Sequence, residues 1–76
     1  MNPVQVLDEL FQKMQIGESL TASQFATSYY NHTDDLITFT DDTYMCYVMS
    51  TNNFYNGKLH TYRREHQFVA EKVENI

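Results

Sequence analysis

The sequence contains little cysteine, proline or glycine and no tryptophan. Its 76 residues include one cysteine, one proline and two glycines. Because Cys46 is the single cysteine, no disulfide can form within the chain, and no Cys/His group has the spacing of a zinc site. This composition is typical of a reducing compartment, and we expect a cytoplasmic protein without a metal or another cofactor.

Long apolar runs are also lacking. No stretch approaches the roughly 20 apolar residues that cross a bilayer, and residues 1–5 have neither the basic nor the apolar part of a secretory signal. We therefore expect no membrane association. The length favours a single domain over residues 1–76. A core this small leaves open a homodimer that would bury more apolar surface.

Catalytic motifs are missing as well. There is no glycine-rich phosphate loop, and the pairs Asp34-Asp35 and Asp41-Asp42 lack the spacing of a calcium-binding loop. Cys46 lies in an apolar run, which favours a buried small hydrophobe over a nucleophile. His32 lies in a polar stretch and is predicted to be a solvated loop residue. We expect no catalytic residues and no enzymatic activity.

Cations are scarce over most of the chain. Residues 1–57 contain Lys13 alone against seven acids, a sum of −6. Residues 58–76 contain four cations and three acids, a sum of +1, so the whole chain carries −5. Most of the surface should therefore repel a phosphate backbone. The cations that lie near one another in the sequence are Lys58, Arg63 and Arg64.

Two helices are predicted in the first part of the chain. Pro3 suits the first turn of a helix, and an apolar stripe follows it as far as Gly17, which predicts a helix over 3–16. The stripe consists of Val4, Leu7, Leu10, Phe11 and Met14. The pair Thr21 and Gln24 has the spacing of a capping box, which predicts a second helix over 22–30. Its buried face would carry Phe25, Ala26 and Tyr29.

The stretch 36–53 allows two interpretations. Residues 36–39 and 43–49 are rich in strand formers and could pair around Asp41-Asp42 as a hairpin. Alternatively, Thr40 and Thr43 could cap a helix over about 41–53 that Asn52-Asn53 would end. The helix is favoured, because a strand here would be apolar on both faces.

The last part of the chain predicts an antiparallel hairpin. Asn56-Gly57 is a strong signal for a two-residue turn. Residues 58–64 alternate, placing Arg63 and Arg64 on opposite faces of a strand. Residues 67–73 are interpreted as the returning strand, after a turn near residues 64–66, although their spacing also fits a helix. The predicted fold class is α+β, a helical N-terminal half followed by a small hairpin.

This order of elements resembles the winged helix-turn-helix family. The likeness extends over nearly the whole chain and rests on element types: an initial helix, a capped helix at Thr21–Tyr30, a third helix at about Asp41–Asn53 and a wing at Lys58–Val73. Small proteins of this kind are common in phages and plasmids. The chain departs from the family in its long 31–40 segment and in a third helix that begins with two acids and has no lysine or arginine.

Two functions follow as expectations. The resemblance implies a small winged-helix regulator that acts on DNA or on a DNA-bound complex, with the three wing cations contacting phosphate. The alternative is an acidic, phage-type inhibitor or interaction protein that occupies a nucleic-acid-binding site on a host protein. Its carboxylates would stand in for phosphates and its tyrosines would supply contact area. The residues expected to bind that partner are Asp34, Asp35, Asp41, Asp42, Tyr44 and Tyr47.

Overall fold

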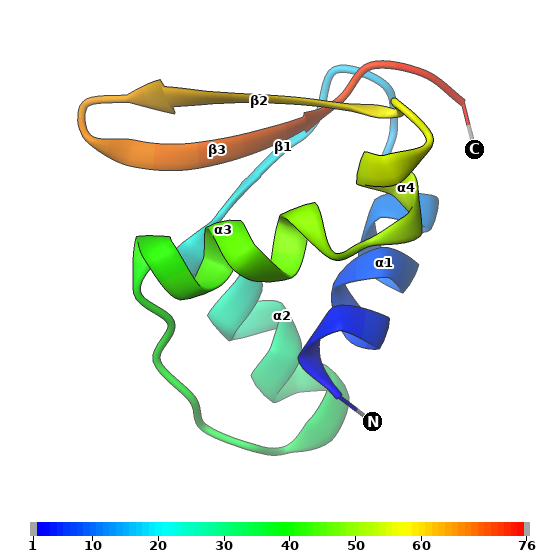
Figure 1. The fold of residues 1–76 in the computed structure, drawn as a ribbon. Coiled ribbons are helices and arrows are strands. Elements are labelled where there is room, and N and C mark those ends of the chain that lie inside the picture. Colours follow the sequence, from blue (N-terminus) through cyan, green and yellow to red (C-terminus); the bar gives the residue numbers. More distant parts are fainter. Residues whose placement is uncertain (1, 76) are drawn as a thin grey trace.

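The computed structural model describes residues 2–75 and has helices packed against a small antiparallel sheet (Figure 1). The elements in chain order are α1 (Pro3–Lys13), β1 (Ser19–Thr21), α2 (Ala22–Thr33), α3 (Asp41–Met49), α4 (Asn52–Tyr55), β2 (Leu59–Arg64) and β3 (Gln67–Lys72). The α+β class is confirmed, with helices first and the hairpin after them. The sheet has one strand more than the hairpin, because β1 joins it.

Helix α1 begins as predicted but ends early. Asn2 caps it by accepting from the Gln5 N–H at 2.9 Å. The expected end at residue 16 is wrong, since Met14 is already extended with ψ 152°. Gly17, with φ +93°, lies instead in the turn that leads to β1.

Helix α2 has the predicted capping box and runs past its predicted end. Thr21 N–H donates to the Gln24 side chain at 2.9 Å, and Gln24 N–H donates to Thr21 Oγ1 at 3.4 Å. The helix continues to Thr33 and stops where Asp34 adopts a left-handed conformation, φ 64°. The interpretation of His32 as a loop residue is therefore wrong: it lies in the last helical turn, with Nε2 3.8 Å from a Glu9 carboxylate oxygen.

For the ambiguous stretch, the helical interpretation is correct and its end is not. Thr40 Oγ1 accepts from the Thr43 N–H at 3.1 Å and starts α3. The helix ends at Met49, and Asn52-Asn53, expected to end it, begin the separate α4. Residues 36–39 form no strand; they belong to the connection between α2 and α3.

The sheet has the strand order β1-β3-β2, antiparallel throughout. The predicted strands over 58–64 and 67–73 are confirmed in essence, and the turn between them is Glu65-His66, with φ 52° and 72°. The predicted turn at Asn56-Gly57 is present and leads into the strand, but it is not a hairpin turn, because a helix and not a strand precedes it. Gly57, with φ +74°, follows the end of α4 and leads into β2.

The core lies between the helices and the inner face of the sheet. Its aromatic centre is Phe25, whose ring stacks on Phe39 at 4.9 Å and lies 5.9 Å from the ring of Tyr44. Two stripe residues of α1, Leu10 and Met14, are only partly buried. The buried apolar and aromatic residues are Val6, Leu7, Phe11, Ala22, Phe25, Tyr29, Phe39, Tyr44, Val48, Leu59, Phe68, Val69 and Ala70. The prediction that Cys46 is buried is wrong, because it lies on the exposed side of α3.

Candidate functional site

The two arginines of the wing lie near its tip and point to opposite faces. Arg63 pairs with Phe68 in the β2–β3 register, and Arg64 pairs with Gln67 next to the turn. The Arg63 guanidinium lies 6.0 Å from the centroid of the Phe68 ring and donates to the His66 carbonyl at 3.3 Å. Both arginines are exposed, where the hairpin extends past the start of α3 (Figure 1). The phosphate backbone of one duplex therefore cannot contact both guanidinium groups fully.

Lys58 does not join the two arginines. It lies just before β2, at the opposite end of that strand, about 17 Å from Arg63 by strand geometry. Its Nζ is 3.4 Å from the Glu74 carboxylate. The structure thus brings two of the three predicted phosphate-binding residues together and pairs the third with an acid.

The four predicted partner-binding acids lie in two pairs at the ends of one connection. Asp34 and Asp35 follow α2, and Asp41 and Asp42 form the first turn of α3. Three of them are exposed, whereas Asp41 is half-buried and accepts from the Phe68 backbone N–H at 3.4 Å. Asp41 therefore also links α3 to the wing.

The two predicted partner-binding tyrosines differ in exposure. Tyr44 is fully buried, and its hydroxyl donates to the Leu20 carbonyl at 2.6 Å, so it offers no contact area. Burial, with a further contribution from the Asp41 charge, raises the pKa of Tyr44 well above its ordinary value. Tyr47 is half-buried against Phe39, with ring centroids 5.6 Å apart.

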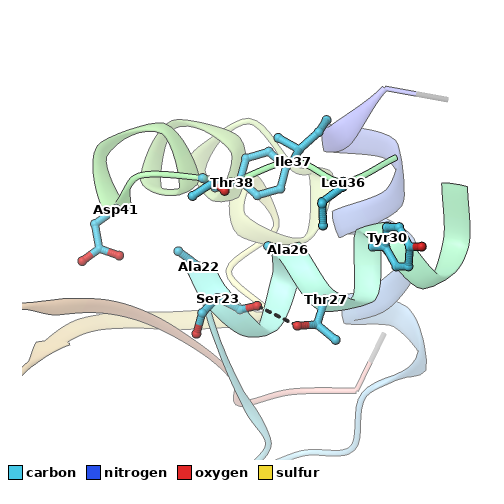
Figure 2. A pocket seen from close by; sticks show the side chains of 10 residues that line it. Ala22, Ser23, Ala26, Thr27, Tyr30, Leu36, Ile37, Thr38 and Asp41 are labelled. Atoms are coloured by element: carbon cyan, nitrogen blue, oxygen red, sulfur yellow. Dashed lines mark hydrogen bonds between the residues drawn. The ribbon is translucent and has the colours of Figure 1, made fainter. Parts of the chain in front are cut away.

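An apolar groove between α2 and the α2–α3 connection was not foreseen from the sequence. It has a volume of about 490 Å³ and lies where the connection runs back along α2 (Figure 1). Figure 2 shows Leu36 projecting from the connection toward α2, with Asp41 at one end and Tyr30 at the other. The groove is lined by Ala22, Ser23, Ala26, Thr27, Tyr30, Leu36, Ile37, Thr38, Phe39 and Asp41.

The sequence does contain a feature of this groove, the apolar pair Leu36-Ile37, but that pair was interpreted as part of a possible strand. Leu36 and Ile37 are strand formers and contributed to the hairpin alternative. The two residues are 87% and 37% exposed, so neither is part of the buried core. An apolar pair between two acid pairs is the pattern that could have indicated a surface site.

The residues that the structure describes contain no helix with the length and apolar character required to span a membrane. Within residues 2–75, no three His, Cys, Asp or Glu side chains are grouped so that they could bind a metal ion. Comparison with protein-family models, curated proteins and solved structures finds no match to this chain.

Proposed function

We propose that this chain is a small winged-helix-like regulatory protein that acts on a DNA-bound protein complex. The order of helices, followed by a hairpin that extends beyond them, supports the winged-helix part of the proposal. So does β1, which lies between α1 and α2 in the sequence and pairs with β3, giving the wing a third strand at its base.

The distribution of charge favours a complex over naked DNA, and this observation carries the proposal. Helix-turn-helix proteins read bases from the N-terminal part of the recognition helix. In α3 that part is Asp41-Asp42, and the helix has no lysine or arginine. Arg63 and Arg64 can add only weak phosphate contacts. Protein contacts must then supply most of the affinity and the choice of site.

Recovery of the complex from cells tests the proposal. A tagged chain is expressed in its source cells, crosslinked and purified with and without nuclease treatment. We expect a DNA-binding protein and its bound DNA to be recovered together. Because protein contacts supply most of the affinity, Arg63→Ala with Arg64→Ala should leave the protein partner and lower the recovered DNA only slightly. Recovery of neither DNA nor a DNA-binding protein would contradict the proposal.

The positions of the acids favour a second candidate, an acidic protein that occupies a nucleic-acid-binding site on a host protein. Asp34, Asp35 and Asp42 are exposed at the two ends of one connection and could stand in for phosphates. In this case the partner would be recovered without DNA, and added duplex would displace the chain. The change Asp34→Asn with Asp35→Asn and Asp42→Asn should then abolish recovery, whereas the arginine changes should not.

A further inference from the structure

The groove beside α2 has an apolar floor and wall that no part of the described chain covers. On the α2 side Ala22 is buried and Ala26 half-buried, so the exposed apolar surface comes from Tyr30, Leu36 and Ile37. Leu36 is 87% exposed and projects into the groove from the other side (Figure 2). Covering such apolar surface is favourable.

The charged residues that line the groove, or directly adjoin its lining in the sequence, are all acidic. Asp41 lines one end, and Asp34 and Asp35 directly precede Leu36 at the other. No lysine or arginine occurs between Lys13 and Lys58, a range that includes all the lining residues. A second copy of the chain would bring the same acids to the same place. The complementary occupant is apolar in its middle and basic at its ends.

We propose that this groove binds a basic amphipathic helix of a partner protein, with apolar side chains on Tyr30, Leu36 and Ile37 and lysines or arginines at the two acid pairs. The connection between residues 35 and 41 spans at most about 20 Å, the length of a helix of about 13 residues. Amphipathic helices that bind grooves through their apolar face are a common recognition mode. The inference deepens the proposed function, on which it rests, since it assigns the protein contact to a surface.

Titration of the ¹⁵N-labelled full chain with designed peptides tests the inference. The probe is a 16-residue helical peptide with leucines along one face and lysines at both ends. Its matched controls are the same peptide with glutamates for the lysines and a scrambled peptide of equal charge. We expect the basic helical peptide alone to shift the amides of residues 22–30 and 34–41, with an affinity that falls as salt rises.

Two variants locate the binding. Leu36→Ser removes exposed apolar surface without touching the core, and it should weaken the peptide about tenfold. Tyr55→Ser is the matched control, because Tyr55 is 88% exposed on α4 and does not line the groove; it should leave the affinity unchanged within about twofold. The change Asp34→Asn with Asp35→Asn should flatten the salt dependence, and asparagine suits the left-handed backbone at position 34.

Several outcomes would overturn the inference. They are equal binding of the scrambled peptide, shifts confined to other residues, no effect of Leu36→Ser, and concentration-dependent shifts of the groove without peptide, which would assign it to self-association. Failure of the proposed function is distinguishable. A peptide that binds the groove while no DNA-bound complex is recovered from cells contradicts the proposed function. If the complex is recovered unchanged with Leu36→Ser, the partner does not bind through the groove.

Discussion

Lys72, at the end of β3, binds backbone carbonyls at the C-terminal end of helix α1. Its side chain is buried, and its Nζ donates to the carbonyls of Gln12 and Met14 at 3.1 and 2.6 Å. A cation at a helix C-terminus also interacts favourably with the helix dipole. Lys72→Met keeps the length of the stem but leaves both carbonyls without this donor. We expect it to lower the free energy of unfolding by about 1–3 kcal/mol, measured by urea denaturation.

The matched control for Lys72 is Lys13→Met at the same end of α1. Lys13 is exposed in the last turn, so only its weak interaction with the dipole is lost. We expect a change below about 1 kcal/mol. Equal effects of the two substitutions would mean that the buried hydrogen bonds of Lys72 contribute nothing beyond its charge.

Because Tyr44 is buried, we expect the folded chain to lose stability steeply at alkaline pH. Burial raises its pKa in the folded chain above the unfolded value of about 10. Above that pH the unfolded chain loses the Tyr44 proton and the folded chain keeps it, so the stability contribution present below pH 10 is lost as pH rises. The free energy of unfolding should fall by up to about 1.4 kcal/mol per pH unit from this residue.

Tyr44→Phe isolates that contribution. The variant loses the hydrogen bond to the Leu20 carbonyl and should be less stable at pH 7 by about 1–2 kcal/mol. Above pH 10 its stability should decline less steeply than that of the parent chain, and urea melts at a series of pH values measure both slopes. Parallel slopes would show that Tyr44 ionises as readily in the folded chain as in the unfolded one.

Among the elements, helix starts could be predicted because their signals are local. Thr21 with Gln24 and Thr40 with Thr43 lie three residues apart, and both sets form the expected caps. Helix ends could not be predicted, because they depend on the backbone conformation of the next residues and on contacts with residues far away in the sequence. Helix α1 stops well before Gly17, and its last carbonyls are bound by a lysine of β3.

Of the candidate site, the alternation of the wing arginines followed from strand geometry alone. The groove did not, because it exists only where the α2–α3 connection runs back beside α2. The burial of Tyr44 likewise depends on its contacts with Phe25 and Phe68, which come from α2 and β3. Such contacts join segments far apart in the sequence, and no local pattern encodes them.

Substitutions in the turn between β2 and β3 should stabilise the chain. A two-residue hairpin turn with positive φ at both positions favours asparagine and glycine, yet Glu65 and His66 occupy them here. Non-glycine residues in this conformation cost about 1–2 kcal/mol each. We expect Glu65→Asn with His66→Gly to raise the free energy of unfolding by about 1–2 kcal/mol, visible as a higher thermal midpoint. Glu65→Gln removes the same charge but keeps the strained backbone, and a similar gain from it would assign the effect to charge instead.

At the scale of the whole molecule, the five cations are not equally available to phosphate. Lys72 is buried against α1, and Lys58 lies beside Glu74. Lys13 is on α1, within residues 1–57, whose charges sum to −6. Arg63 and Arg64 remain exposed at the wing tip. A chain with a formal charge of −5 thus offers duplex DNA only a narrow positive contact.

This arrangement predicts weak DNA binding with a small salt dependence. With at most two phosphate contacts, the slope of log K against log salt should be about −1 to −2 for one subunit on random duplex DNA, measured by fluorescence anisotropy. Lys58→Ala should leave the slope unchanged, because that ammonium already lies beside Glu74. Arg63→Ala with Arg64→Ala should bring it close to zero. A slope of about −4 or steeper requires more cations than one wing supplies. It would mean that two subunits bind together, and sedimentation at the same protein concentrations would then have to show a dimer.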